Sequence, residues 1–348
     1  MSEQPATVPA TVPATPVGAP LASPPVSVVL AVRDEERFLD GAVRRILGSG
    51  YAGELEVVLA VAPSIDRTRE IADELAAHDP RVQVVDNPTG WTPNGLNLAV
   101  AAARHDILVR VDGHSELSPG YITEAVEVLT RTGAANVGGR MLPVGETPFE
   151  QAVARAMSTP LGIGAASFHT GGDEGPAPTV YLGVFRRDAL AKVGGFDERF
   201  VRAQDWELNH RLRAAGETVW FDPRLGVDYR PRGSYRALAR QFYKTGQWRR
   251  FVMREYPETA SWRYLAPPAA TAGVVGGLVL GAVGATVGPR WLLAGLAAPV
   301  GYGAIVAVGA VVAGRGLPAG ARRHLGPVVA TMHLTWGAGF LRGVRPKG

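Results

Sequence analysis

The chain has 348 residues, which is enough for one large domain and an additional segment. It contains 36 lysines and arginines and 32 acidic residues, and the net charge of +4 is too small to indicate a nucleic-acid partner. The absence of cysteine excludes a disulfide framework and thiolate metal ligands. Heavy use of Ala, Gly, Val and Arg is typical of a GC-rich bacterial genome.

Residues 1–25 form a Pro/Ala/Thr-rich segment that repeats Pro-Ala-Thr-Val. Proline removes backbone donors and blocks helices, and the segment has little apolar surface to bury, so we expect disorder. It lacks the basic start and unbroken apolar core of a signal peptide, and we do not expect it to be one.

Strands alternate with helices from residue 26 onward. Continuous apolar runs predict buried strands at Val26–Val32, Leu55–Val61, Val82–Val85 and from Ile107. Helical patterns lie between and after them, at about 38–47, 66–77, 94–103 and 119–130. This alternation predicts a parallel, doubly wound α/β sheet. Neither a G-x-G-x-x-G motif after the first strand nor a G-K-[ST] loop is present, which argues against a dinucleotide-binding or P-loop enzyme.

The stretch Ile107–His114 places an acid and an imidazole at the end of a buried strand. Its apolar run stops at Asp112, and Gly113 frees the backbone to turn. Ligands of open α/β sheets bind beyond the carboxyl ends of the strands, so Asp112 and His114 are expected on one side of that crevice. Such a pair suits a divalent cation that holds a diphosphate. The alternative is that Asp112 caps the turn and His114 is an ordinary surface residue.

The second half of the domain supplies a further acid. Tyr181–Phe185 is predicted to be a strand, Gly194–Asp197 a tight turn, and residues from Gln204 to Ala215 a helix. Asp205 would sit in the first turn of this helix, where we expect the macrodipole to lower its pKa and keep it ionised. The alternative is an ordinary first-turn acid.

Residues 234–263 are predicted to contain a basic, aromatic helix just before an apolar region. Arginines and lysine alternate there with tyrosine, phenylalanine and tryptophan. Such a helix could lie on an anionic membrane surface, or its arginines could hold phosphates, and its two faces allow both.

Separated motifs resemble the family 2 glycosyltransferases, which have the GT-A fold. The resemblance covers residues 26–250 and is carried by six pieces in the family's order: Val32–Glu36, Ser64–Thr68, Gly95–Asn97, Asp112–His114, Gln204–Asp205 and Gln247–Arg249. The branch it resembles most is that of membrane-tethered exopolysaccharide glucosyltransferases of the succinoglycan type.

The resemblance implies a role for each matching residue. Asp205 would be the catalytic base, and Asp112 and His114 would hold Mn²⁺ or Mg²⁺. The nucleotide-sugar donor would be bound by Arg33, Glu35, Asp66, Asn97, Asp112, Trp248 and Arg249. One base without an enzyme nucleophile implies a single displacement with inversion. Glu35 could instead be a solvated acid, and Asp66 a plain helix cap.

Two departures from the family's pattern matter. Val61 and Ala62 stand where the family often has adjacent aspartates, one of which reads the base, so uridine recognition is not secured. His114 replaces a second metal-binding aspartate, which removes a negative charge and weakens the expected hold on the cation.

The C-terminal region is predicted to be a membrane module. Residues 264–314 contain two uncharged runs, Leu265–Val287 and Trp291–Gly314, each long enough to span a bilayer, joined by a tight hairpin. Gly273, Gly277 and Gly281 form a small-residue ridge suited to close helix packing. Arginines are more numerous after the second run than at the hairpin tip, so we expect a multi-pass protein of the cell membrane with a cytoplasmic catalytic domain.

Residues 315–348 contain a basic loop and a third, shorter apolar segment, Leu325–Leu341. We expect that segment to be interfacial or re-entrant, because a crossing would leave the terminal basic residues outside. A third crossing is the alternative.

The leading interpretation is inverting transfer of a sugar to a lipid-linked saccharide or surface glycan at the cytoplasmic face. One alternative loads a sugar onto polyprenyl phosphate. Another is a non-catalytic, glycosyltransferase-like assembly subunit, which Ala62 and His114 keep open. The uncharged spans argue against a transporter.

Overall fold

The computed structural model describes residues 23–163 and 166–344, so the expected disordered tail lies almost entirely outside the described residues. Within them, one mixed sheet has the strand order β3-β2-β1-β4-β8-β6-β9-β5, with β7 paired to β9. The strands are β1 (Val26–Val32), β2 (Leu55–Val61), β3 (Val82–Asp86), β4 (Ile107–Arg110), β5 (Glu116–Leu117), β6 (Asn136–Pro143), β7 (Gly175–Pro176), β8 (Tyr181–Arg186) and β9 (Val219–Tyr229).

The longest pairings in the sheet are parallel. β1 runs parallel to β2 and β4, β2 to β3, and β6 to β9. β8 reverses direction between β4 and β6, because it pairs antiparallel with both. The carboxyl ends of β1 and β4 therefore lie at the same edge of the sheet, as a doubly wound arrangement requires.

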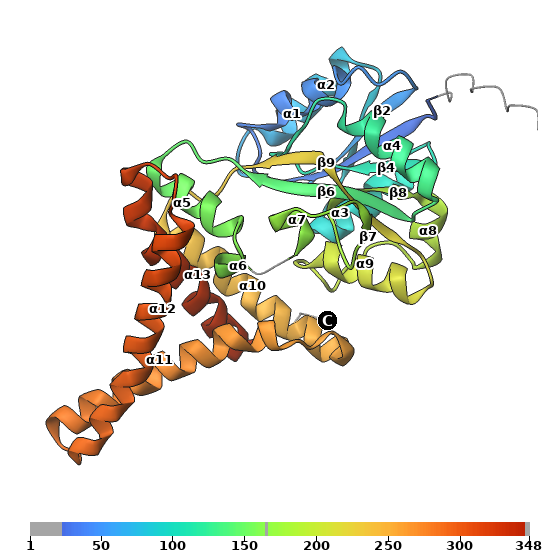
Figure 1. Ribbon diagram of the computed structural model, residues 1–348. Helices are drawn as coiled ribbons and strands as arrows, with labels where there is room; N and C mark the ends of the chain where they lie inside the picture. Colours follow the sequence, from blue (N-terminus) through green and yellow to red (C-terminus); the bar gives the residue numbers. More distant parts are fainter. Residues whose placement is uncertain (1–22, 164–165, 345–348) are drawn as a thin grey trace, which may run out of the picture.

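Helices cover both faces of the sheet (Figure 1). Apolar side chains of α1, α2 and α4 pack on one face, and those of α3, α8 and α9 on the other. The bounds are α1 (Leu39–Leu47), α2 (Thr68–His78), α3 (Thr92–Ala102), α4 (Tyr121–Thr132), α5 (Pro148–Met157), α6 (Pro160–Ile163), α7 (Ser167–Thr170), α8 (Arg187–Lys192) and α9 (Gln204–Ala214). The predicted mostly parallel α/β domain is confirmed.

A helical region follows the sheet. It consists of α10 (Tyr235–Glu255), η1 (Pro257–Thr259), α11 (Trp262–Thr286), η2 (Arg290–Leu296), α12 (Ala297–Ala313) and α13 (Ala319–Arg342). α5, α10 and α13 share an apolar cluster that includes Val153, Phe242, Val328 and Met332. In Figure 1 the tip of the α11–α12 hairpin points away from the sheet, and α10 and α13 lie between this tip and the sheet.

Two segments are long and apolar enough to cross a membrane, Trp262–Thr286 and Arg290–Ala313. Their apolar side chains are largely exposed, as Val300 and Val311 are at 69% and 71%, which suits contact with lipid. The glycine ridge packs as expected: a Cβ on Gly277 would lie 2.3 Å from the carbonyl oxygen of Gly295, and η2 covers Gly281 as well.

The third apolar segment differs in length from the expectation. Leu325–Leu341 is the greater part of α13, a continuous helix of 24 residues in which Leu325, Val328 and Met332 are fully buried. The helix is longer than expected because it already begins at Ala319. Ala321, in its first turn, is fully buried.

Candidate active site

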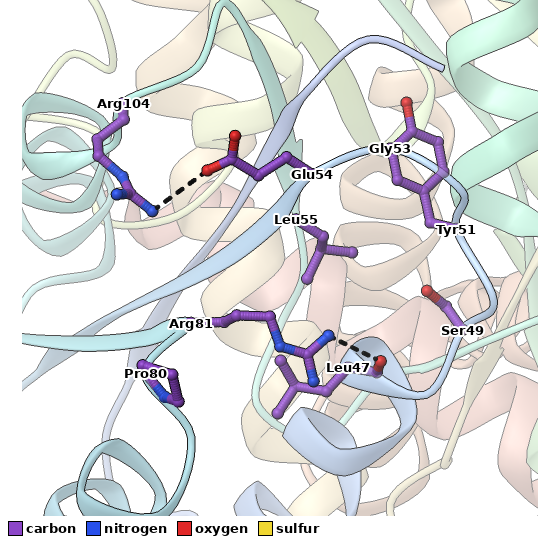
Figure 2. Close-up of a pocket in the computed structure, with 9 residues that line it drawn as sticks. All are labelled: Leu47, Ser49, Tyr51, Gly53, Glu54, Leu55, Pro80, Arg81 and Arg104. Atoms are coloured by element: carbon purple, nitrogen blue, oxygen red, sulfur yellow. Dashed lines mark hydrogen bonds and ion pairs between the residues drawn. The ribbon is translucent and has the colours of Figure 1, made fainter. Parts of the chain in front are cut away.

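A cavity of about 1050 Å³ lies at the carboxyl ends of β1 and β4, between the sheet and the helical region. The predicted site residues that border it are Arg33, Glu35, Asp112, His114, Asp205, Trp248 and Arg249. A smaller cavity of about 330 Å³ lies at the opposite, amino-terminal ends of the strands (Figure 2). Two of its polar side chains are already engaged: Arg81 donates to the carbonyl of Leu47, and Arg104 pairs with Glu54. The site chemistry therefore belongs to the larger cavity.

The guanidinium of Arg110 joins the two central acids. Arg110 is the last residue of β4, and its side chain is 3% exposed. Its Nη2 donates to Oδ1 of Asp112 over 2.9 Å, and its Nη1 donates to Oδ1 of Asp205. Burial disfavours its charge, but the attraction of Asp205 and then of Asp112 raises the pKa of Arg110 above its ordinary value. Asp112 and Asp205, 93 positions apart in sequence, thus face the same cavity.

The pKa of Asp205 departs from the sequence-based expectation. The residue does lie in the first turn of α9, but burial raises the pKa of its carboxyl, and the nearby Asp112 charge adds to this. Arg110 opposes the shift without reversing it. The expectation of a lowered pKa was wrong because desolvation outweighs the helix macrodipole here. A carboxyl with a raised pKa is better suited to accept a proton at neutral pH.

His114 is held by Glu35. Its Nδ1 lies 2.7 Å from Oε1 of Glu35, and this hydrogen bond raises the pKa of His114 against the opposing effect of burial. Nε2 makes no hydrogen bond within residues 23–163 and 166–344, and a histidine with an acid on its other ring nitrogen is a common arrangement among metal ligands. The raised pKa means that a cation would have to displace a proton from the ring.

Asp112 and His114 fit a cation only as part of a larger set of ligands. Among the described residues, no group of three or more His, Asp or Glu side chains is placed to hold a metal ion. Mg²⁺ and related ions bind to one or two carboxylates and complete their shell with water and substrate phosphates. The residues present are therefore compatible with a cation that arrives with, or is completed by, a diphosphate.

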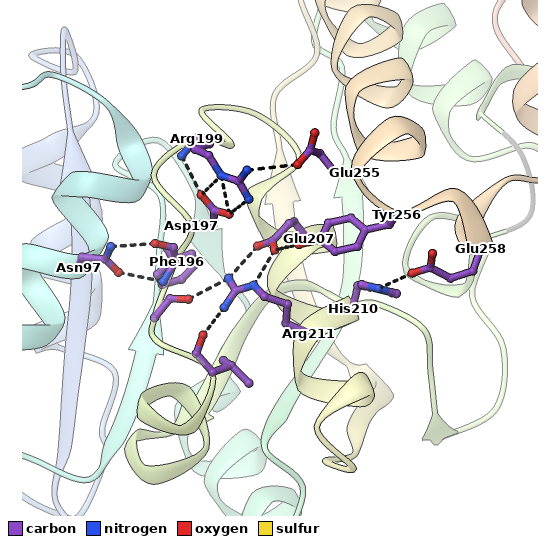
Figure 3. A network of polar contacts seen from close by, with 12 residues as sticks. Asn97, Phe196, Asp197, Arg199, Glu207, His210, Arg211, Glu255, Tyr256 and Glu258 are labelled. Carbon is purple, nitrogen blue, oxygen red and sulfur yellow. Dashed lines mark hydrogen bonds and ion pairs between the residues drawn. The ribbon is translucent and has the colours of Figure 1, made fainter. Parts of the chain in front are cut away.

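Asp66 and Asn97 do not border the cavity. Asp66 accepts hydrogen bonds from the backbone of Glu36 and from Thr68, and the Thr68 hydroxyl is the main cause of its lowered pKa. Asn97 exchanges two hydrogen bonds with the backbone of Phe196, which fixes the Gly194–Asp197 turn (Figure 3). Both residues hold the loops that surround the site.

The helix that carries Asp205 is anchored to the helical region (Figure 3). Glu207, fully buried on α9, accepts hydrogen bonds from Arg211 and from the hydroxyl of Tyr256, which follows α10. His210 lies 3.0 Å from Glu258 in η1, and Arg199 joins Asp197 to Glu255. These contacts fix the position of α9, and with it Asp205, relative to the end of α10 and to η1.

The opposite wall of the cavity is aromatic. Trp248 is buried beside Phe200 and Phe251, so most of its ring packs in the protein. The guanidinium of Arg249 lies 4.8 Å from the ring of Trp206 and 4.3 Å from that of Tyr264. Trp206 follows Asp205 directly, so this wall begins beside the catalytic candidate.

Arg110 was not identified from the sequence. It is a charged residue within an apolar strand, and it precedes Asp112 by the two positions that put both side chains on the same side of a strand. A buried arginine is rarely found without acidic partners, so this position already indicated a nearby pair of carboxylates. The identity of the second, Asp205, could not be read from the local pattern.

Comparisons with known proteins agree with this fold. Residues 27–194 match the model of the family described as Glycosyl transferase family 2. Succinoglycan biosynthesis protein ExoA of Rhizobium meliloti (strain 1021) is 32% identical over 321 residues, which cover 90% of this chain and 93% of that protein.

Two more distant similarities complete the comparison. Dolichyl N-acetyl-alpha-D-glucosaminyl phosphate 3-beta-D-2,3-diacetamido-2,3-dideoxy-beta-D-glucuronosyltransferase of Methanococcus voltae is 21% identical over 239 residues, covering 66% of this chain and 74% of that protein. Among solved structures, mannosyltransferase PcManGT from Pyrobaculum calidifontis, in complex with GDP-Man and Mn²⁺, has a TM-score of 0.61 at 19% identity. That match covers 93% of this chain and 88% of the mannosyltransferase, and it shows the shared fold.

The sheet, the acids at its carboxyl edge and these comparisons define a glycosyltransferase with the GT-A fold. The chain belongs to glycosyltransferase family 2. It combines this catalytic domain with two C-terminal helices that are long and apolar enough to cross a membrane.

Proposed function

We propose that this protein transfers a sugar, with inversion, from a nucleotide-sugar donor to a lipid-linked saccharide or surface glycan at the cytoplasmic face of the cell membrane. The observation that carries the proposal is the Arg110 bridge, which brings Asp112 and Asp205 to one cavity bordered by α11 and α13. The named relatives support the acceptor class, since one acts in succinoglycan biosynthesis and another on a dolichyl phosphate-linked sugar.

Asp205 is the proposed catalytic base. An acceptor hydroxyl that attacks the anomeric carbon must lose its proton, and a partly buried carboxylate with a raised pKa can take it. Arg110 holds this carboxylate in position and limits the shift of its pKa. Because the acceptor hydroxyl is the only nucleophile in this mechanism and no enzyme side chain attacks the sugar, the displacement is single and inverts the anomeric centre.

The sheet side of the cavity would bind the donor. Asp112 and His114 would hold Mn²⁺ or Mg²⁺, which when bound neutralises charge on the departing diphosphate. Arg33 and Glu35 border the same part of the cavity, and Glu35 also orients His114. Asp66 and Asn97 would act indirectly, by fixing the neighbouring loops.

The proposed orientation places α11 and the η2–α12 segment across the membrane and the catalytic domain in the cytoplasm. Arg290 is the one charged residue of the hairpin tip, whereas Arg315, Arg322 and Arg323 follow the second segment. Protease accessibility of a C-terminal tag in sealed vesicles would test the sidedness of α13.

The function is tested with UDP-, GDP- and dTDP-sugars in the presence of Mn²⁺. The correct donor should raise the melting temperature of the purified protein, because binding to the folded state stabilises it. With a membrane lipid extract as acceptor source, transfer of labelled sugar should occur and should stop on chelation. No donor binding and no transfer under any of these conditions would favour the non-catalytic assembly subunit.

A polyprenyl-phosphate glycosyltransferase remains the second candidate, because paired arginines face the apolar part of the cavity. The product distinguishes the two candidates. Loading of polyprenyl phosphate yields a monosaccharide on a monophosphate, whereas extension of a lipid-linked saccharide yields a longer glycan.

A further inference from the structure

Arg249 carries a charge that the described part of the protein leaves without an acidic partner. Its guanidinium lies between the rings of Trp206 and Tyr264, and its Nη1 is buried without a hydrogen-bond partner among the described residues. Burial lowers the pKa of Arg249, and the charge of Arg263 lowers it further. A buried donor without a partner costs stability, so such a group is expected where a ligand supplies the acceptor.

A second arginine faces the same tyrosine. The guanidinium of Arg263 lies 4.7 Å from the ring of Tyr264 and donates to its hydroxyl over 2.6 Å. Arg249 comes from α10 and Arg263 from the start of α11, so two like charges from different helices meet at one ring. An anion placed between them would relieve this repulsion, and arginine forks suit phosphate oxygens.

The cavity beside this pair is mainly apolar, although His333 of α13 also borders it. Beyond Tyr264 it is lined by Ala266, Pro267 and Ala270 of α11 and by Met332 and Trp336 of α13. α11 continues from there into the exposed apolar hairpin. A ligand that occupies this part of the cavity would therefore combine a phosphate with a hydrocarbon chain.

The position of the pair relative to the acids favours the acceptor over the donor. Trp206, whose ring contacts the guanidinium of Arg249, follows Asp205 directly in α9. Asp112 and His114, on the donor side, follow the end of β4, and Arg110 of that strand holds Asp112 by a hydrogen bond. Asp205 thus stands between a site suited to the donor and a second anion site that opens toward the membrane helices.

We propose that Arg249 and Arg263 bind the phosphate group of a polyprenyl-linked acceptor around Tyr264, with its hydrocarbon chain between α11 and α13. This assignment rests on the proposed function and moves Arg249 from the donor, where its motif had placed it, to the acceptor. The phosphate is held near Asp205 so that the acceptor hydroxyl can reach the base.

Direct binding tests the site without requiring turnover. The full-length protein in detergent is titrated with a long-chain polyprenyl phosphate, the matching polyprenol and inorganic phosphate. Wild type should bind the polyprenyl phosphate at least about tenfold more tightly than either other probe, given the usual strength of charge-assisted hydrogen bonds. Arg249→Gln and Arg263→Gln should each remove most of this difference.

Two controls keep the result interpretable. Arg254→Gln changes an exposed arginine of the same helix and should bind all three probes as wild type does. Arg263 is also exposed, so Arg263→Gln should fold even if the more buried Arg249→Gln does not. Thermal shifts with the nucleotide-sugar donor are measured on every variant and should match wild type.

Three outcomes would overturn the proposal. In the first, wild type binds polyprenol as tightly as polyprenyl phosphate. In the second, it binds inorganic phosphate as tightly as polyprenyl phosphate. In the third, the variants lose donor binding while their lipid binding stays unchanged. Failure of the proposed function gives a different pattern. In that case no nucleotide sugar binds or is transferred, while the preference of wild type for the phosphorylated lipid and its loss in Arg263→Gln persist.

Discussion

The two walls of the cavity are built in different ways. The sheet wall carries Arg110, Asp112 and His114 within five consecutive positions at the end of β4 and in the turn that follows, and its charges are paired with other charged side chains. The helix wall brings Arg249 and Tyr264 together from separate helices, and its arginines have aromatic rings as neighbours. The sheet wall is thus held by its own ion pairs, whereas the helix wall leaves positive charge for a ligand.

This difference suggests a division of labour. A cation and a diphosphate can bind at the sheet wall by replacing some of the ion-pair partners that its charged side chains already have. The helix wall is shaped by the packing of α10, α11 and α13, so its site depends on the docking of the apolar hairpin. Perturbations of the two walls should therefore have separable effects.

Short of removing Asp205 itself, the largest effect is expected from removing the central cation of the sheet wall. Arg110→Gln leaves Asp112 and Asp205 facing each other without a compensating charge. The pKa of Asp205 should rise further, and the acid limb of the kcat profile should move upward by about 1–3 pH units. On the acid limb, where the base becomes protonated, turnover at a fixed pH should fall about tenfold for each pH unit of this displacement.

Arg110 is buried, so its replacement also tests folding. Arg110→Lys keeps one charge in the same place and should move the acid limb less than Arg110→Gln does. Circular dichroism and thermal melting establish that each variant is folded. Identical pH profiles for wild type and both folded variants would show that Arg110 does not tune Asp205.

The helix wall can be disturbed through its close helix contact. A Cβ on Gly246 of α10 would lie 2.0 Å from the carbonyl oxygen of Trp336 on α13. Gly246→Ala should therefore separate these helices at a cost of about 1–3 kcal/mol. It should weaken binding of the polyprenyl phosphate while leaving donor binding close to that of wild type.

Gly276→Ala is the matched control, because a Cβ there would meet nothing within 4 Å. It should change stability by no more than about 1 kcal/mol, the usual difference in helix propensity. Thermal unfolding in detergent compares the two variants. Equal stability of Gly246→Ala and Gly276→Ala would mean that the close contact of α10 and α13 is not required.

The smallest effect is expected far from both walls. Glu56 is buried in β2 and accepts hydrogen bonds from Ser27 and from the Arg104 backbone and guanidinium. Burial opposes its charge, but these hydrogen bonds lower the pKa of Glu56 overall. Glu56→Gln keeps the shape, loses the charge and should cost about 1 kcal/mol of stability at pH 7.

The pH dependence of this cost has a defined sign. Because the folded pKa of Glu56 is lowered, its contribution is complete above the unfolded value of about 4.3 and disappears as pH falls through the folded value. The difference in melting temperature between wild type and Glu56→Gln should therefore shrink in acid. A difference that grew in acid would contradict this account, as would altered donor binding.

Much of the sheet could be predicted from the sequence. β1 and β2 have the predicted bounds because strands buried on both faces are continuous apolar runs. β6 and β9 were missed because their patterns are interrupted. β9 contains Pro223 and Arg224, and β6 contains Gly139, where a Cβ would lie 1.9 Å from the carbonyl oxygen of Leu225.

The site was predicted in part. Asp112, His114 and Asp205 stand at element ends that local patterns reveal, and the structure brings them to one cavity. The pairing of Arg110 with Asp205 depends on how β4 and α9 pack, which local sequence does not encode. The same holds for Arg249 and Tyr264, whose contact depends on the turn between α10 and α11.

The central claim is that Asp205 accepts the proton of the acceptor hydroxyl in a cavity shared with the donor. The most direct measurement compares turnover and donor affinity in Asp205→Asn and wild type. We predict that kcat falls by about 10²–10⁴, the usual contribution of a general base, while the donor dissociation constant stays within about threefold of the wild-type value. Near-normal turnover in a folded Asp205→Asn protein would contradict the account.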